Sequence, residues 1–165
     1  MGMTNCEIHY HPIGVIHSEH RAEDKTPIQP LFAKGCRGCV ELFSEFADGL
    51  LDLQDFSYIY LIYHFHKAQQ VKMRVKPYLQ DVDHGIFATR APFRPNPIGL
   101  SVVELLNIEG CILHFDGADM IDGTPLLDIK PYVSRFDMRK VKKNGWQDEV
   151  DEHVAKKRGK RGYPS

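Results

Sequence analysis

Short apolar or alternating runs dominate this sequence, and glycine, proline, asparagine and aspartate interrupt them about every ten residues. Runs of this length are typical of β-strands. The aromatic and β-branched run at residues 56–66 predicts a buried central strand. A sheet of about six or seven strands in hairpin order removes its exposed edges by closing. We therefore expect a mainly β protein: a single-domain antiparallel β-barrel with a short helix.

Local patterns place further elements. Residues 45–56 predict the short helix, and residues 107–110 predict a hairpin turn. Asp122 and Gly123 predict a second turn, because glycine readily adopts positive φ. The strand that follows this turn is expected to end at Pro131.

Residues 71–76 alternate between apolar and basic side chains, which predicts a strand with its apolar face on the core. The apolar positions are Val71, Met73 and Val75, and the basic ones are Lys72, Arg74 and Lys76. The basic face is expected to point to solvent or to phosphate.

A length of 165 residues and a hydrophobic content of 42% fit one globular domain. We place the barrel in residues 1–136, and residues 137–165 are expected to form a polar, basic extension that is partly helical and partly disordered. With 21 basic and 22 acidic residues, attraction to nucleic acid must come from local clusters of charge. The sequence has no apolar run long enough for a membrane span and no signal-peptide pattern, so we expect a soluble cytoplasmic protein.

Four cysteines are present, and Cys36 and Cys39 form a C-R-G-C motif. No second ligand pair follows at zinc-finger spacing, so no metal site is predicted. The expected role of this segment is a glycine turn before a strand.

The stretch "ATRAPFRPNPIGLS", residues 88–101, carries three prolines and two arginines. Each proline fixes its own φ and restricts the preceding residue, so the loop is stiff before anything binds. A stiff loop with two guanidinium groups is suited to bind a carboxylate or phosphate at low entropic cost. The alternative is a plain crossover at one end of the barrel with solvated arginines.

Residues 85–105, "GIFATRAPFRPNPIGLSVVEL", and residues 120–133, "MIDGTPLLDIKPYV", closely resemble the signature of the TrmO/TsaA family. "PIGVIHS", "TPIQP", "GCRGCVELF" and "DFSYIYLIYHFH" extend the resemblance over roughly residues 9–134. The resemblance implies a β-barrel tRNA methyltransferase that uses S-adenosylmethionine (SAM) and forms a homodimer. It implies methylation of N6 of the threonylcarbamoyl-adenosine on the 3′ side of the anticodon. No G-x-G-x-x-G motif is present, so a Rossmann-like site is not supported.

The resemblance also implies the positions of the cofactor contacts. They fall on Pro27, Ile28, Gln29, His66, Lys67, Arg90, Leu100, Asp122, Gly123, Thr124 and Pro125. Lys67 departs from the glutamine expected in the bacterial pattern, and the bacterial carboxy-terminal domain is replaced by a short basic tail. Arg90 is suited to the SAM carboxylate.

A carbamoylated nitrogen is a poor nucleophile, so a general base is expected. The candidates are Asp122, Asp128 and His66. Asp122 has the alternative role of forming its turn, Asp128 that of a salt bridge to Arg90 or Lys130, and His66 that of a core histidine.

Basic side chains are the candidates for tRNA phosphate contacts. They are Arg94, Lys72, Arg74 and Lys76, together with Lys157, Arg158 and their basic neighbours in the tail. The alternative is a solvated basic surface. Two other functions stay open: a SAM-binding or RNA-binding barrel without chemistry, and a methyltransferase for a different, smaller acceptor.

Overall fold

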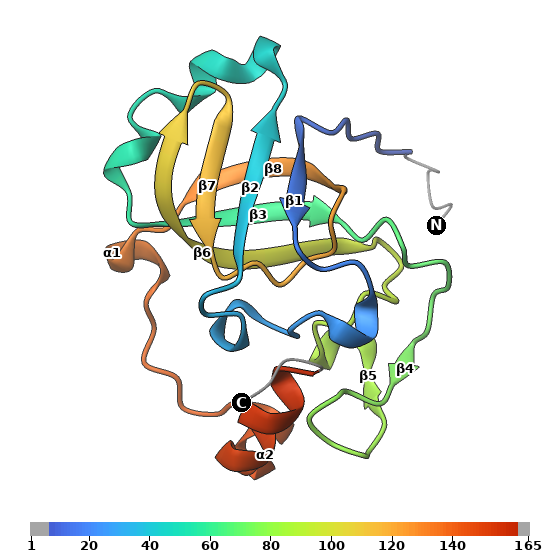
Figure 1. The fold of residues 1–165 in the computed structure, drawn as a ribbon. Helices are drawn as coiled ribbons and strands as arrows, with labels where there is room; N and C mark the ends of the chain where they lie inside the picture. The colour runs from blue at the N-terminus through green and yellow to red at the C-terminus, as the bar shows by residue number, and fades with distance from the viewer. Residues whose placement is uncertain (1–6, 162–165) are drawn as a thin grey trace, which may run out of the picture.

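A computed structural model describes residues 7–161 and shows a closed barrel of six antiparallel strands (Figure 1). Around the barrel the strands follow the order β1, β2, β7, β6, β3, β8. Their bounds are Gly14–Ser18 for β1, Arg37–Leu42 for β2, Tyr58–His64 for β3, Ile98–Glu109 for β6, Ile112–Asp116 for β7 and Thr124–Pro131 for β8. The predicted mainly β, closed architecture is confirmed.

Alternate side chains of the strands fill the barrel. On β3, Ile59, Leu61 and Tyr63 are buried, whereas Tyr58 and His64 are exposed. β3 pairs with β6 on one side and with β8 on the other, so the aromatic run does form a central strand. The other fully buried side chains of the core include Ile16, Val40, Val103, Leu113, Phe115 and Leu126.

The predicted turns lie where the chain reverses. Gly110, at φ 61°, joins β6 to β7, and β6 continues through Asn107 to Glu109, so the turn is tighter than predicted. Gly123, at φ 79°, precedes β8. β8 ends at Pro131, as the sequence predicts.

The short helix predicted at residues 45–56 is present as two 3-10 helices, Ser44–Leu50 and Leu53–Asp55. Asp52, at φ 65°, separates them. Their buried side chains, Leu50 and Leu53, belong to the barrel core.

The strand predicted at residues 71–76 is largely wrong. Only Arg74–Val75 forms a strand, β4, which pairs with β5 (His84–Gly85) in a separate two-stranded ribbon. Val75 is buried, but Val71 and Met73 are 59% and 55% exposed. A period of two indicates which residues share a face, and it does not ensure that another layer covers that face.

The segment after β8 contains α1 (Ser134–Asp137), a 3-10 helix (Gly145–Glu149) and α2 (Glu152–Gly159). Asp151 caps α2 by accepting hydrogen bonds from the amides of His153 and Val154. In Figure 1, α2 lies below the barrel, close to the β4–β5 ribbon. Residues 162–165 of the predicted tail lie outside the described residues.

Three further 3-10 helices occur in the loops, at Glu23–Lys25, Pro30–Phe32 and Ile86–Ala88. Within residues 7–161, every helix is too short or too polar to cross a membrane.

Candidate functional site

Arg90 and Gln29, both predicted cofactor contacts, are in direct contact. Arg90 follows the 3-10 helix Ile86–Ala88, and Gln29 lies in the loop between β1 and β2. Nη1 of Arg90 donates a 2.7 Å hydrogen bond to Oε1 of Gln29. Among the described residues Gln29 is the one hydrogen-bond partner shown for this exposed side chain. Most of the guanidinium donors therefore stay available to an anionic ligand.

Arg94, the second arginine of the proline-rich loop, forms hydrogen bonds with the backbone of the same segment. Its Nη1 donates hydrogen bonds to the carbonyl oxygens of Thr89 (2.8 Å) and Ile86 (3.1 Å). The guanidinium carbon also lies 5.7 Å from the centre of the Phe87 ring. These contacts hold the segment that leads to Arg90, so the two arginines of the loop have different environments.

A hydrogen-bonded chain of three side chains lies inside the barrel. The hydroxyl of Ser101, on β6, donates a 2.6 Å hydrogen bond to Oδ1 of Asp119. Because Ser101 has a single hydroxyl proton, Tyr63 on β3 donates its own to Ser101 Oγ, at 2.9 Å. The Tyr63 ring also covers Gly99, where an added Cβ would lie 2.1 Å from a ring atom. Glycine at position 99 is thus required for the ring to reach Ser101.

The Asp119 carboxyl titrates near neutrality. Although the residue is partly exposed, its carboxyl lies among protein atoms, and this burial raises its pKa to about 7, against the hydrogen bond from Ser101 and the positive charge of Arg90. Burial and the nearby Asp119 charge also raise the pKa of Tyr63 well above 10. A carboxyl that changes protonation near pH 7 is suited to general acid or base catalysis.

Asp119, Ser101 and Tyr63 were not predicted from the sequence. A signal was present, because the inward positions of β6 run Gly99, Ser101, Val103, and a serine in that series is a polar group in a core position. Such a group needs a partner, and the partner lies 18 residues along the chain.

Asp122 connects the turn before β8 to the end of β1. It is ion-paired with Arg21, accepts a 3.2 Å hydrogen bond from the amide of Ser18 and lies 3.3 Å from Nδ1 of His17. Burial raises the pKa of this carboxyl, but the Ser18 amide, the His17 ring and the Arg21 charge outweigh that effect, so the pKa is lowered. These contacts fit the alternative of turn formation.

Among the contacts of the described residues, none joins Arg90 to Asp122. The Arg90 charge acts instead on the carboxyl of Asp119, which lies three positions before Asp122 in the chain.

Asp128 and Leu100 lie on the outer surface of the barrel. Both pair with Ile62, from opposite sides of β3. Asp128 accepts an ion-pair contact of 2.8 Å from Nζ of Lys130, one of the alternatives that the sequence left open. Leu100 is 47% exposed.

His66 and Lys67 follow the end of β3. Burial, the Lys67 charge and His64 lower the pKa of His66, so its ring is neutral at pH 7 and able to accept a proton. Lys67 is exposed.

The remaining predicted cofactor residues offer mainly backbone. Pro27 and Thr124 are buried, and the Thr124 hydroxyl donates a 2.6 Å hydrogen bond to the carbonyl of Ile121. Ile28 and Pro125 are partly buried, and Gly123 lies at the exposed tip of its turn.

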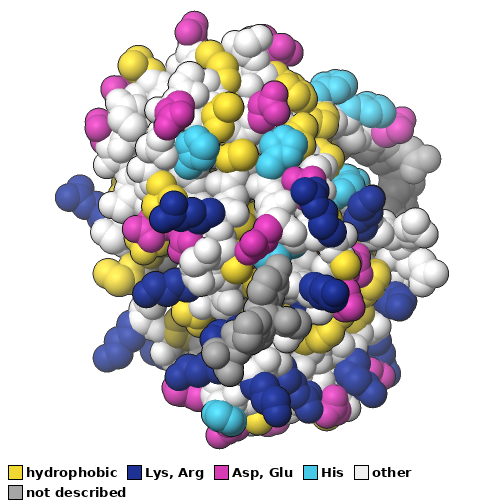
Figure 2. Space-filling model, in the orientation of Figure 1, with side chains coloured by type: hydrophobic (Ala, Val, Ile, Leu, Met, Phe, Trp, Pro, Cys, Tyr) yellow, Lys and Arg dark blue, Asp and Glu magenta, His cyan; other side chains and the backbone are white. Residues whose placement is uncertain are grey.

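Basic side chains gather on the lower half of the face in Figure 2, where α2 and the β4–β5 ribbon lie in Figure 1. Lys72, Arg74, Lys76 and Lys157 are exposed. Lys72 Nζ lies 4.6 Å from the centre of the Phe93 ring. Arg158 is paired with Asp81, with Nη2 3.1 Å from Oδ2.

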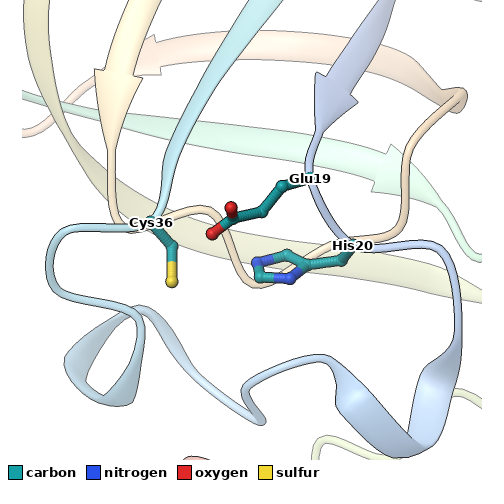
Figure 3. Close-up of side chains that lie close together, drawn as sticks. All are labelled: Glu19, His20 and Cys36. Atoms are coloured by element: carbon teal, nitrogen blue, oxygen red, sulfur yellow. The ribbon is translucent and has the colours of Figure 1, made fainter. Parts of the chain in front are cut away.

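Glu19, His20 and Cys36 approach one another at one end of the barrel (Figure 3). Their ligand-type atoms lie within 4.8 Å of one another. Burial, the Glu19 charge, a hydrogen bond to Glu19 and the Asp116 charge raise the pKa of Cys36 to about 11. Burial and the neighbouring carboxylates thus disfavour the thiolate, which is the form of cysteine that binds a metal. Cys39, the other cysteine of the motif, takes no part in this group.

A surface hollow of about 600 Å³ contains none of the predicted site residues. Its lining includes Glu41, Glu45 and Glu109. Three carboxylates disfavour an anionic substrate there, so the chemistry points to the Arg90 region instead.

Comparisons with known proteins identify related chains. The family model for the tRNA-methyltransferase O N-terminal domain matches residues 15–138. A probable S-adenosyl-L-methionine-binding protein from Pyrococcus abyssi is 50% identical over 149 residues, which is 90% of this chain and 81% of that protein. The tRNA (adenine(37)-N6)-methyltransferase of Mus musculus is 38% identical over 133 residues, which is 76% of this chain and 31% of the mouse protein.

Solved structures agree with the fold. A crystal structure of TrmO from Pseudomonas aeruginosa superposes with a TM-score of 0.71 at 39% identity, covering 84% of this chain and 62% of that one. The chain thus spans less than two thirds of this bacterial structure and about a third of the mouse enzyme.

Proposed function

Because this chain belongs to the tRNA-methyltransferase O family, we propose that it transfers the methyl group of SAM to tRNA, at N6 of the threonylcarbamoyl-adenosine 3′ of the anticodon. SAM is its cofactor, in keeping with the relatives named for SAM binding. The observation that carries the proposal is the contact between Arg90 and Gln29 beside the Asp119 carboxyl.

The donor site is built around Arg90. Its free guanidinium donors fit the carboxylate of the amino-acid part of SAM, and Gln29 Oε1 holds the guanidinium in place. Bound SAM supplies an electrophilic methyl group on a sulfonium. The stiff proline loop, which the internal contacts of Arg94 reinforce, keeps Arg90 in position and so favours alignment for in-line transfer.

Asp119 is our choice for the general base. In the proposed step a bond forms between N6 and the methyl carbon, the bond from that carbon to sulfur breaks, and the N6 proton goes to the Asp119 carboxylate. A pKa of about 7 suits this role, since about half of the Asp119 carboxyls are ionised at pH 7 and the carboxylate is still basic enough to accept a proton. Asp122, with its lowered pKa and its pairing to Arg21, is a weaker base, and Asp128 is paired with Lys130. His66 is the second candidate.

The tRNA is proposed to contact the exposed basic side chains below the barrel. Lys72, Arg74, Lys76 and Lys157 are the residues we assign to phosphates. Arg94 and Arg158 already have protein partners, so we give them a smaller share of binding.

We also propose that this chain forms a homodimer and acts in the cytoplasm. Leu100, at 47% exposure, and Ile98, at 42%, place apolar surface on the outside of β6, where a second copy of the chain would cover it.

Transfer of labelled methyl from SAM tests the function. Three acceptors separate the candidates: tRNA carrying the threonylcarbamoyl group, the same tRNA without it, and the free modified nucleoside. Label in the first acceptor alone supports the proposal. SAM binding without transfer to any acceptor indicates a non-catalytic SAM-binding barrel, and transfer to the free nucleoside with equal efficiency indicates a small-acceptor enzyme.

A further inference from the structure

Trp146 connects the C-terminal extension to the segment that carries Arg90. Its indole stacks on the His84 ring, with ring centres 4.8 Å apart and planes 17° from parallel. Its Nε1 donates a 2.8 Å hydrogen bond to the carbonyl of Ala88, two residues before Arg90. One side chain thus holds both β5 and the approach to the arginine.

Gly159, at the end of α2, connects the same extension to the segment that carries Gln29. The amide of Ile28, the residue before Gln29, donates a 3.1 Å hydrogen bond to the carbonyl of Gly159. The Gly159 backbone also packs on the Phe32 ring, where an added Cβ would lie 2.6 Å from ring atoms. The close approach depends on the absence of a side chain at this position.

Four further contacts hold the extension between these two attachments. Arg158 pairs with Asp81, and Gln80 Nε2 lies 3.4 Å from Glu149 Oε2. Arg161 lies over the Tyr78 ring, with the guanidinium carbon 3.7 Å from the ring centre, and donates to the carbonyl of Glu23. The extension therefore spans from the loop after β1 to the β4–β5 ribbon, as Figure 1 shows for α2.

We propose that residues 144–161, here called the strut, are a positioning element of the donor site that holds Arg90 and Gln29 at hydrogen-bonding distance. No strand pairing joins the two loops that carry these residues, because β1 and β2 do not neighbour β5 among the described strands. The strut forms a hydrogen bond with one loop at Ile28, next to Gln29, and with the other loop at Ala88, two residues before Arg90. The family model ends at residue 138, so the strut lies outside the matched residues. This inference rests on the proposed use of SAM.

The full-length variants Trp146→Phe and Gly159→Ala test the strut. Trp146→Phe keeps an aromatic ring on His84 but loses the N–H donor to Ala88. Gly159→Ala pushes α2 away from Phe32. We expect each to weaken SAM binding about three- to tenfold in calorimetry, the effect of losing one hydrogen bond or its alignment. Gln147→Ala removes an exposed neighbour of Trp146 and serves as the matched control, with unchanged affinity expected.

Two measurements separate positioning from a general loss of stability. Amide exchange of the SAM-free protein is expected to rise in residues 27–32 and 86–91 and to stay unchanged in β3 and β6. In an Arg90→Ala background, Trp146→Phe is expected to cause no further loss of SAM affinity, because the pair it positions is already absent.

An equal loss in both backgrounds, or unchanged affinity in both strut variants, overturns the proposal. Wild-type protein that fails to bind SAM would instead reject the proposed function on which the strut depends.

Discussion

The hydroxyl of Ser101 donates a 2.6 Å hydrogen bond to the carboxylate of Asp119, and this contact joins β6 to the loop before β8 inside the barrel. It links a titrating carboxyl to a fully buried hydroxyl and, through it, to Tyr63. Both the reactivity and the pH behaviour of the protein are expected to depend on it.

Replacing Asp119 with asparagine keeps the shape of the side chain and removes the base. We expect the single-turnover rate of methyl transfer to fall about 10²- to 10⁴-fold. SAM affinity, measured by calorimetry, is expected to change little. Asp122→Asn serves as the comparison, and a larger loss of rate there would assign the base to Asp122 instead.

The rate of methyl transfer is expected to depend on pH through Asp119. Because only the ionised carboxylate accepts a proton, the rate should rise about tenfold per pH unit below about pH 7 and level off above it. A profile that stays flat from pH 5.5 to 8.5 would contradict this assignment.

The free energy of unfolding is expected to fall as pH rises, whereas the rate of methyl transfer is expected to rise. The folded pKa of Asp119 is raised from 3.8 to about 7, so the folded state holds a proton that the unfolded state releases between these values. Unfolding free energy should therefore decrease as pH rises from about 4 to 7, by roughly 2 to 4 kcal/mol. Chemical denaturation of Asp119→Asn should lack this decrease, and the variant should be more stable than wild type at pH 8.

Ser101→Ala removes a hydrogen bond that favours the ionised carboxylate. The pKa of Asp119 should consequently rise, and the midpoint of the pH–rate profile should move to higher pH. A midpoint that moves to lower pH, or stays in place, would show that Ser101 does not control the titrating group.

Arg90→Ala is expected to weaken SAM binding about 10- to 100-fold, because a carboxylate loses its charged partner. Arg90→Lys should recover only part of this loss, since lysine keeps the charge but lacks the planar fork. Arg37→Ala, at an exposed arginine of β2, is the control. Equal affinity for Arg90→Ala and Arg37→Ala in calorimetry would reject the assigned contact.

Removing Arg74 and Lys76 together should lower tRNA affinity and reduce the slope of log K against log salt by about 1.5 to 2. SAM affinity should not change. The pair Lys34→Ala and Arg37→Ala removes the same charge elsewhere on the surface, and an equal effect from that pair would remove the case for a specific basic face.

The sequence predicts the barrel because the relevant signals are local. The aromatic run of β3 and the glycine turn before β8 each lie within a dozen residues, and both appear where they are expected. Val71 and Met73 show the limit of such signals, because burial depends on what lies opposite.

The candidate site was predictable only in part, because its contacts join residues that are far apart in the sequence. The resemblance led to Arg90 and Gln29, which lie 61 positions apart and do meet. Asp119 was missed because its pairing with Ser101 arises from closure of the barrel, and the pairing of Asp122 with Arg21 spans 101 positions. No local pattern reports contacts of that separation.

The Tyr63 ring occupies the space that a side chain at position 99 would need. Any residue larger than glycine there must be accompanied by a smaller one at position 63, which would also remove the hydroxyl that reaches Ser101. Positions 63 and 99 therefore have to change together under selection. In a library randomised at both positions, we expect several pairs of residues to allow folding without activity. Only the pair of tyrosine and glycine is expected to keep both folding and activity.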